Sequence, residues 1–385
     1  MIKIILATAV LACVLVMFTR AVHRLYLHPL SRFPGPKLWV AFPIAKNIAQ
    51  LRECLDFRIR DFADEYGDVI RIGPEQLVFT SAQAWRDIYG HGHPEIPKHF
   101  PDAAKAHGTA SNIINSNSQD HFRFRRAMLP AFSDRALKEQ EPLIAGYVDL
   151  LVKRLKAEAA SGECADMVKW YTFTTFDFIG ELAYGKSFDG LSQGKDNHWV
   201  SNIENMMRLF PILVLAGSLP LLSKLLLLFT SDTVKKSKCE HLRLTTELTE
   251  QRINSQSQAH RGDFMDFIMR ADGQDHGLSR AELAANSDVL IVAGSETTAT
   301  LLCGVTYHLL RTPQALYRCA EEIRAAFKHE SHINFASVTA QLPYMQACLN
   351  EALRMFPPVP TVLFREVTSG QVCVVNGQEI PGKVR

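Results

Sequence analysis

Hydrophobic positions along this chain recur mostly with the spacing of an α-helix and alternate as in a β-strand only in short stretches. The strand-like stretches are residues 69–72 and 77–79, separated by a Gly-Pro turn, and residues 371–375, followed by an Asn-Gly turn. Helical spacing is found around residues 51–65, 121–129, 143–158, 165–183, 239–255, 279–310, 313–327 and 344–355. The pattern predicts a mainly α-helical body with small β-sheets near both ends of the sequence.

The first apolar run covers residues 4–18 and contains no charge, with Thr8 as its only hydroxyl. Extension through Val22, with Arg20 reaching back to the interface, brings the run close to the length of a bilayer span. We therefore predict a transmembrane anchor over residues 1–22, with the basic flank keeping the body on the cytosolic side. A cleaved signal peptide is the alternative, but the flank after the run is basic and bulky rather than small.

Prolines are dense after this run, at Pro29, Pro34 and Pro36. Because each proline fixes φ and removes a hydrogen-bond donor, residues 23–38 are predicted to form a stiff, extended linker. The body of the protein is then expected over residues 39–385.

A second intensely apolar stretch covers residues 209–229, where Pro211, Gly217, Pro220 and Lys224 interrupt it. The interruptions favour two short helices that contact a membrane interface, and a second transmembrane helix is the alternative.

Composition narrows the possible functions. Lys and Arg number 42 against 40 Asp and Glu, a formal charge of +2, which argues against a nucleic-acid-binding protein. An apolar fraction of 47% indicates a chain that folds. The eight cysteines form no C-x-x-C pair and no zinc-type spacing, so they are interpreted as mostly buried, reduced thiols. The histidines at 91, 93, 99 and 107 are interpreted as part of a polar loop, with a metal site as the alternative.

The candidate chemistry begins on the helix predicted over 279–310. Residues 279–282 read Ser-Arg-Ala-Glu, a capping box, and residues 293–298 read Ala-Gly-Ser-Glu-Thr-Thr. Hydroxyls in a helix can bond back to a preceding carbonyl, and we expect a local bulge there that opens room beside the helix. Gly294 and Thr297 share a face, with Glu296 alongside as a possible proton source. The alternative is a small-residue face used for helix packing.

Two further motifs flank this helix in the sequence. Residues 121–126 read His-Phe-Arg-Phe-Arg-Arg, which alone is compatible with a solvated helix face. Glu351 and Arg354 are three residues apart on a helix, within reach of an ion pair, and a Pro-rich exit follows at residues 357–360.

Taken in order, these motifs resemble the cytochrome P450 superfamily, in particular microsomal fungal members of secondary metabolism. The motifs are Tyr-Leu-His-Pro-Leu and Pro-Gly-Pro near the N-terminus, His-x-Arg-x-Arg-Arg, Ala-Gly-x-Glu-Thr-Thr, and Glu-x-x-Arg before the prolines. The resemblance covers the chain from the anchor to Arg385. It implies a P450 fold, a haem cofactor, and the family's oxygen-activating role for Gly294, Glu296 and Thr297, in which the Thr and the acid relay protons.

The resemblance also implies roles for residues outside that helix. Arg125 matches the arginine of the family's Trp-x-x-x-Arg motif, which binds a haem propionate, and His121 occupies the Trp position. Arg365 matches another propionate-binding arginine. Glu351 and Arg354 match the family's buried structural ion pair. Residues 209–229 fall where the family has a membrane-dipping, substrate-admitting loop.

The family's axial cysteine is the residue that this sequence lacks. The family places it in a Phe-x-x-Gly-x-Arg-x-Cys-x-Gly loop, and the sequence stops at Arg385 without that motif. Cys303, Cys348 and Cys373 are interpreted as inert thiols because none lies in a Gly-rich loop. The expected fold is therefore a P450 fold lacking its haem-ligand loop and last helix, with no metal ligand in this chain.

Three hypotheses follow for the function. The first is a truncated P450 monooxygenase relative that is inactive by itself. The second is an active haem-thiolate monooxygenase whose chain continues past Arg385, and the third is a membrane-tethered ligand-binding protein without haem. By resemblance, a complete enzyme would oxidise a lipophilic secondary metabolite at the endoplasmic reticulum, with electrons from NADPH delivered by a membrane-bound P450 reductase.

Overall fold

The computed structural model describes residues 2–92, 95–99, 110–162, 164–195, 197, 199–203, 232–255, 262–269, 277–360 and 363–385. They belong to two compact units. The N-terminal unit contains the described residues up to 99 together with 363–385, and the helical unit contains those between 110 and 360. The predicted membrane-dipping stretch at 209–229 lies outside the described residues.

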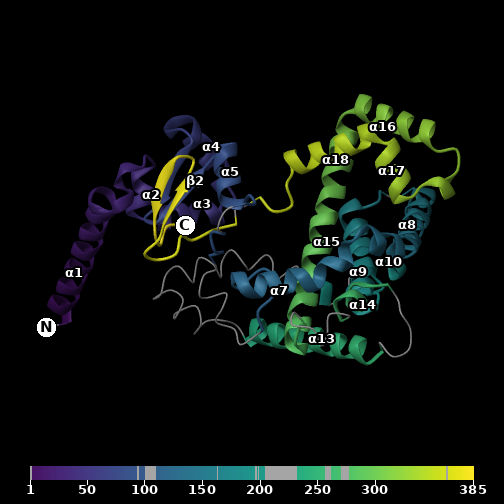
Figure 1. The fold of residues 1–385 in the computed structure, drawn as a ribbon, viewed down its shortest axis with the longest axis horizontal. Helices are drawn as coiled ribbons and strands as arrows, with labels where there is room; N and C mark the ends of the chain where they lie inside the picture. Colours follow the sequence, from purple (N-terminus) through teal and green to yellow (C-terminus); the bar gives the residue numbers. More distant parts are fainter. Residues whose placement is uncertain are drawn as a thin grey trace. The chain divides into compact units, whose positions relative to one another are not determined.

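The N-terminal unit combines short helices with two antiparallel hairpins (Figure 1). Its elements in chain order are α1 (Ile2–Val22), η1 (His23–Leu27), η2 (Pro29–Arg32), α2 (Lys37–Ala41), α3 (Ile44–Leu51), α4 (Leu55–Tyr66), β1 (Val69–Gly73), β2 (Gln76–Phe79), α5 (Ala82–Tyr89), β3 (Val372–Val375) and β4 (Gln378–Pro381). Both predicted hairpins are confirmed: Val69 pairs with Phe79 in the first, and Val372 pairs with Pro381 in the second.

The Pro-rich segment after α1 is packed into this unit, and the prediction of an extended linker is wrong for residues 23–27 and 29–32. Residues His23–Leu27 form a π-helical turn and Pro29–Arg32 a 3-10 turn, with Pro29 at its start, where a fixed φ suits a helical turn. Leu30 is fully buried. Next to it, a Cβ on Gly35 would lie 2.2 Å from the carbonyl oxygen of Arg71, so only glycine allows this approach to β1.

The helical unit contains the seven helices predicted after residue 81, with boundaries shifted by a few residues in most cases. Its elements are α7 (Ser118–Met128), η3 (Leu129–Phe132), α8 (Asp134–Ser161), α9 (Met167–Tyr184), α10 (Gly190–Gln193), α13 (Asp232–Ser255), α14 (Phe264–Met269), α15 (Arg280–Arg311), α16 (Pro313–Ala326), η4 (Glu330–His332), α17 (Phe335–Gln341) and α18 (Pro343–Met355). The largest difference is at α8, which begins at Asp134 because Ser133 caps it, and which continues through Pro142.

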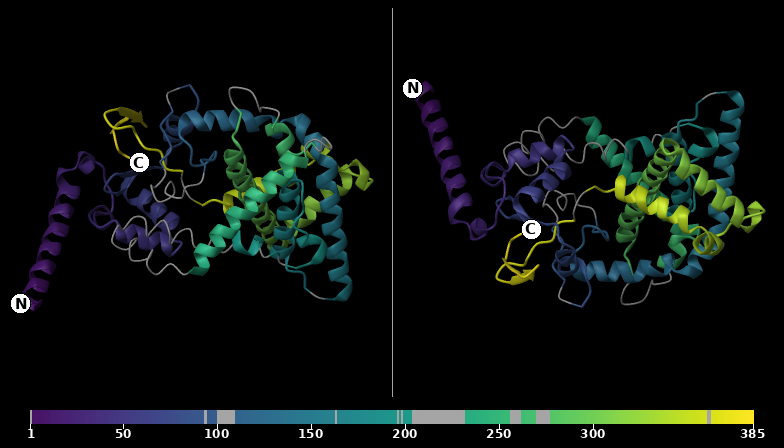
Figure 2. Two further views of the ribbon diagram at one scale, coloured as in Figure 1. Left: turned by 90° about the horizontal axis from the view of Figure 1, so that it is seen from below. Right: turned by 90° about the horizontal axis from the view of Figure 1, so that it is seen from above.

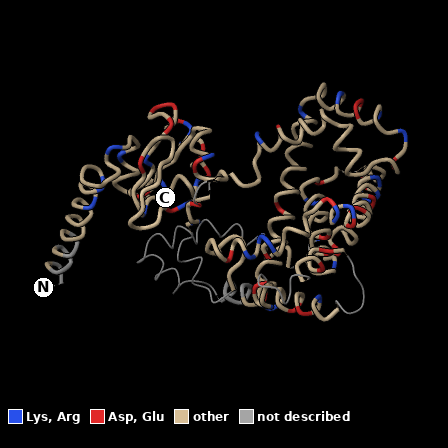
Figure 3. The backbone as a smooth tube through the Cα atoms, in the orientation of Figure 1, with Lys and Arg blue, Asp and Glu red and all other residues tan. Residues whose placement is uncertain are grey.

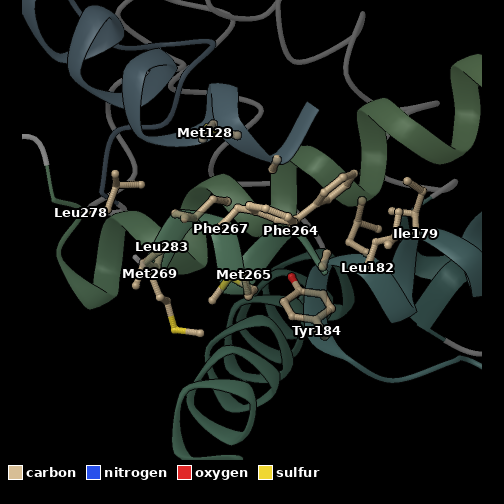
Figure 4. Packing of buried hydrophobic residues seen from close by; sticks show 14 of the residues in the cluster. Met128, Ile179, Leu182, Tyr184, Phe264, Met265, Phe267, Met269, Leu278 and Leu283 are labelled. Carbon is tan, nitrogen blue, oxygen red and sulfur yellow. The ribbon is translucent and has the colours of Figure 1, made fainter. Parts of the chain in front are cut away.

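The core of the helical unit lies around α15, which packs along α9 and also contacts α13, α16 and α18 (Figure 2). Phe124, Phe176, Leu182, Met265 and Ile291 are almost completely buried in one cluster. Figure 4 shows part of this cluster, with side chains from α7, α9, α14 and α15 meeting. Helix α15 is also long and apolar enough to cross a membrane by length and composition, with a mean hydropathy of 1.5 over an 18-residue window that is 22% buried. It packs on four other helices of this unit.

A buried ionic cluster joins α13 to the start of α14. The Arg252 guanidinium donates to Asp263 at 2.8 and 2.9 Å and to Asp266 at 2.6 Å. All three side chains are at least 96% buried. The backbone N–H of Gly262 adds a 2.9 Å hydrogen bond to Asp266. The Arg252 guanidinium therefore compensates buried charge on two carboxylates.

Arg252→Ala is expected to lower the free energy of unfolding by about 3–5 kcal/mol, because it removes one partner of a buried, hydrogen-bonded ionic cluster. The measurement is urea unfolding of the detergent-solubilised chain. Arg243→Ala is the matched control on the same helix, since Arg243 and Glu247 form an exposed pair. It is expected to change stability by less than about 1 kcal/mol. Equal losses in the two variants would contradict this account.

Lys46 on α3 is buried, and its ammonium group donates a 2.5 Å hydrogen bond to Gln76. Burial, with a smaller contribution from the Arg385 charge, lowers the pKa of Lys46 to about 8 from an ordinary 10.5. Between pH 8 and pH 10.5, Lys46 therefore binds a proton in the unfolded chain but is mostly deprotonated in the folded chain.

The free energy of unfolding is therefore expected to rise between pH 8 and 10.5, by up to about 3 kcal/mol from this residue. Lys46→Met removes the titrating group and should lower the slope across this window. The measurement is urea unfolding of both proteins at a series of pH values. Identical slopes would show that Lys46 titrates normally in the folded protein.

Candidate functional site

The site predicted from sequence is organised by α15, and the start of this helix is held by α7. The capping box of Ser279 and Glu282 is present as predicted. Arg123 on α7 pairs with the Glu282 carboxylate and donates a 2.9 Å hydrogen bond to the carbonyl oxygen of Gly277. Hydrogen bonds from Arg123 lower the pKa of Glu282, so the pair stays ionised near neutral pH. Arg123 lies in the predicted basic motif, but its anchoring role was not predicted.

The middle of α15 keeps its helical geometry through the candidate catalytic residues. The hydroxyl of Ser295 donates to the carbonyl oxygen of Ile291 at 2.5 Å, and that of Thr297 donates to Ala293 at 2.6 Å. This confirms the predicted bonds back to the preceding turn. The predicted bulge is wrong, because α15 runs unbroken from Arg280 to Arg311. Each of these carbonyl oxygens can accept both the side-chain hydroxyl and the backbone N–H of the helix. The hydroxyl bonds therefore leave the helical hydrogen bonds in place.

Gly294 is the point of close contact between α15 and α9. A Cβ on Gly294 would lie 2.5 Å from the Cδ1 atom of Ile179, whose side chain is buried in the core. The small-residue packing face, which was the alternative from sequence, is therefore present here. Glu296 and Thr297 follow within one turn and are half-buried.

The two candidate propionate-binding residues of the helical unit lie on α7. His121 is half-buried and Arg125 is exposed. Within the described parts of the chain, the guanidinium of Arg125 has no recorded hydrogen bond or ion pair, in contrast to that of Arg123. Arg125 is thus a cation whose charge is available to an anionic group.

Arg365 belongs to the N-terminal unit, where it pairs with Lys98 in an isolated β-bridge. Its Nη1 atom donates to Glu95 at 2.9 Å and to the carbonyl oxygen of Ile96 at 3.0 Å. Its Nε atom is buried and has no partner among the described residues. An unsatisfied buried donor on a guanidinium fits a carboxylate ligand such as a haem propionate. Burial and the Arg365 charge together lower the pKa of Lys98 to about 8.

Glu351 and Arg354 form the predicted ion pair on α18. Two parallel hydrogen bonds of 2.7 Å join the guanidinium to the carboxylate, and they lower the pKa of Glu351. The expectation that this pair is buried is wrong for this structure, because the two side chains are 59% and 67% exposed. Met355, four residues after Glu351 and on the same face of α18, is also exposed, so no described residue covers this face.

Two of the three cysteines considered as ligands, Cys303 and Cys373, are in surroundings that disfavour a thiolate. Burial, with the charge of Asp166, raises the pKa of Cys303. Burial, with the charge of Asp87, raises the pKa of Cys373 in the second hairpin. Cys348 is half-buried on α18. A thiol with a raised pKa stays protonated near neutral pH and is a poor metal ligand.

The histidine-rich loop is described only in part, since residues 93 and 107 lie outside the described ranges. His91 is exposed, and His99 contacts the Glu366 carboxylate at 2.6 Å. Among the described residues, no group of three or more His, Cys, Asp or Glu side chains is arranged to hold a metal ion.

A hydrogen-bond network that sequence analysis missed links Trp199 to α13 and α15. Trp199 donates from Nε1 to Nδ1 of His241 at 2.9 Å, and Nε2 of His241 lies 2.8 Å from Asp288. The indole N–H of Trp199 can only donate, so Nδ1 of His241 accepts and carries no proton. The proton of the imidazole ring is therefore on Nε2, which donates to Asp288. The network thus joins α13 to α15 through a neutral imidazole. No periodic signal marks these residues, since they are far apart in sequence.

The model of the family described as "Cytochrome P450" matches residues 34–384. The chain belongs to the cytochrome P450 family. Similar proteins are the trichothecene C-4 hydroxylase of Trichoderma arundinaceum, 43% identical over 94% of this chain and 72% of the relative, and the cytochrome P450 monooxygenase dtxS2 of Metarhizium robertsii, 44% identical over 94% and 69%. The averantin hydroxylase of Dothistroma septosporum is 36% identical over 94% and 68%.

These comparisons confirm the resemblance on which the assignment of site residues rests. They support a relative of fungal P450 monooxygenases, and a mainly helical structure with small sheets agrees with that family. The roles of His121, Arg125 and Arg365 remain predictions, as do those of Glu296 and Thr297.

Gly294→Ala in this P450 is expected to be about 1–2 kcal/mol less stable than the control Gly304→Ala, because the added methyl group overlaps Ile179 in a packed core. In the control, a Cβ on Gly304 meets Phe356 at an ordinary 3.5 Å. The measurement is urea unfolding. Ile179→Val removes the Cδ1 atom and should restore most of the loss in the double variant. Equal stabilities of the two Ala variants would show that the helices are not held together at Gly294.

Proposed function

We propose that this P450 belongs to fungal secondary metabolism and that its family activity is the oxidation of a lipophilic metabolite. The support is that its relatives include hydroxylases named for a trichothecene and for averantin. Electrons would come from NADPH through a P450 reductase, as the family implies. Haem, when bound, supplies the activation of dioxygen.

The residues of this chain would hold and serve that cofactor. In the helical unit, Arg125 would bind a haem carboxylate, as the family resemblance implies, with His121 four residues before it on α7. In the N-terminal unit, the unsatisfied Nε donor of Arg365 is the group that fits a carboxylate. Thr297 donates its hydroxyl proton to Ala293, so the hydroxyl must rotate away from that carbonyl before it passes a proton elsewhere. Glu296, half-buried and adjacent in sequence, would resupply the proton.

We further propose that these 385 residues alone are inactive as a monooxygenase, because none of their cysteines provides an axial thiolate. The observation that carries this proposal is the surroundings of the candidate thiols. Cys303 lies within the long helix α15 and Cys373 within a hairpin, and burial raises the pKa of both. A ligand cysteine instead needs surroundings that stabilise the thiolate.

The second candidate is an active enzyme whose chain continues past Arg385 with the missing ligand. The observation that favours it is the length of the relatives, of which this chain covers 68–75% in the most similar examples. In that case the exposed face of α18 would be covered by the additional residues.

Attachment to the endoplasmic reticulum membrane through α1, with the body on the cytosolic side, is part of the same proposal. Leu11, Leu15 and Phe18 on α1 are each more than 60% exposed. An exposed apolar helix followed by basic residues suits a bilayer better than water. The proposed boundaries are an anchor over residues 1–22 and a P450 domain over 39–385.

The reduced 385-residue protein, expressed in membranes with haem supplied, is expected to show no thiolate-type Soret band in a carbon-monoxide difference spectrum. The full-length trichothecene C-4 hydroxylase, treated in the same way, is the positive control. A thiolate-type band from the 385 residues would overturn the proposal of inactivity. Cys373→Ser and Cys348→Ser would then identify the ligand, because the band would be lost in one of them.

A further inference from the structure

Two cysteines of the helical unit lie on neighbouring helices. Cys319 is on α16 and Cys348 is on α18, and these two helices pack against each other (Figure 1). Cys319 is only 5% exposed, whereas Cys348 is half-buried. Residues 320–347 separate the two cysteines in the sequence, so no local pattern brings their thiols together.

Polar and aromatic contacts fix which faces of α16 and α18 meet. Helix α16 carries both acidic and basic side chains (Figure 3). The Glu322 carboxylate accepts hydrogen bonds from the backbone N–H groups of Tyr344 and Met345, at 2.8 and 2.9 Å. The guanidinium carbon of Arg318 lies 4.2 Å from the ring centre of Tyr344, in a cation–π contact. Two successive turns of α16 therefore contact the first turn of α18.

Both thiols belong to the faces that these contacts define. Cys319 is three residues before Glu322, and Cys348 is three residues after Met345. Each cysteine therefore lies within one turn of a contact residue, on the same side of its helix. Burial, then the charge of Cys348 and then that of Glu322 raise the pKa of Cys319. Because a charge acts in this way only at short range, the effect agrees with two thiols that face each other.

Cys303 and Cys373 provide a comparison within the same chain. Both are half-buried, as Cys348 is. Burial raises the pKa of each, but the charges that add to this effect come from carboxylates, Asp166 for Cys303 and Asp87 for Cys373. The thiol neighbour distinguishes Cys319 from these two cysteines.

We propose that Cys319 and Cys348 form a reversible redox pair, and that their oxidation to a disulfide joins α16 to α18. This modification site goes beyond the proposed monooxygenase function and does not depend on haem. The oxidant is a low-molecular-weight disulfide such as oxidised glutathione. In a reducing cytosol the pair is expected as two thiols, and the disulfide is expected when the proportion of oxidised glutathione rises.

The oxidation takes place by two thiol–disulfide exchanges. Cys348, the more accessible thiol, loses its proton and attacks one sulfur of oxidised glutathione. A protein–glutathione disulfide forms, and the glutathione thiolate that leaves takes up the proton. Cys319 then loses its proton and attacks the Cys348 sulfur, so that the second glutathione leaves as a thiolate and is protonated. Two protein thiols are thus oxidised to one disulfide, and one glutathione disulfide is reduced to two thiols.

The disulfide has a structural consequence for α18. It closes the loop of residues 320–347 and thereby restricts the unfolded chain, which stabilises the folded state. Cys348 is three residues before Glu351, so the bond also ties the turn of α18 that begins the exposed ion pair to α16.

The test is equilibration of the full 385-residue chain, solubilised in detergent, in buffers with an increasing ratio of oxidised to reduced glutathione. Free thiols are blocked with N-ethylmaleimide, and the protein is digested with trypsin without a reductant. Because trypsin cleaves after Arg and Lys, the disulfide would join the peptide of residues 319–324 to that of residues 329–354, which mass spectrometry identifies. Cys348→Ser and Cys319→Ala should each abolish this linked species. Cys303→Ser is the matched control and should retain it.

We expect the linked peptide to be severalfold more abundant than any disulfide that contains Cys303 or Cys373, and to be lost when dithiothreitol is added. The urea midpoint of the oxidised chain should shift upward, and Cys348→Ser should lack this shift. A glutathione adduct on Cys348 without the linked peptide, in a chain whose circular dichroism is unchanged, would overturn the proposal, because the two thiols then do not meet. Unmodified thiols in the most oxidising buffer, or a bond from Cys348 to Cys303 or Cys373, would overturn it as well.

Discussion

The close packing of α15 on α9 is the constraint on which the rest of the helical unit depends. At Gly294 the two helices approach so closely that a single methyl group would overlap Ile179. The same stretch of α15 buries Ile291 and Ser295 completely. Because α13, α16 and α18 also pack on α15, the position of this one helix constrains the positions of these three helices.

Polar contacts fix the position of α15 along its axis relative to α7 and α13, which apolar packing alone specifies less sharply. Arg123 fixes its first turn by pairing with Glu282. One turn and a half later, His241 ties Asp288 to α13 through a neutral imidazole. Such contacts are directional, and a small shift would leave buried groups unsatisfied. The hydroxyl of Thr297 is consequently presented at a defined point of a rigid, unbroken helix.

The two units expose different kinds of surface. The ion pair of Glu351 and Arg354 on α18 is exposed in the helical unit. The N-terminal unit begins with 52 residues that contain no Asp or Glu, and Leu11, Leu15 and Phe18 on its first helix are exposed.

The sequence by itself determined the helical class, the two hairpins, the capping box at Ser279 and the family, because periodicity, turn residues and ordered motifs are local signals. It also indicated that Glu351 and Arg354 would pair, since they are one turn apart. Only the tertiary structure decided that Gly294 serves close packing, that Arg123 rather than Arg125 anchors α7, and that Lys46 on α3 is buried. Each of these depends on which distant residue lies opposite, and a one-dimensional pattern of polar and apolar positions does not contain that information.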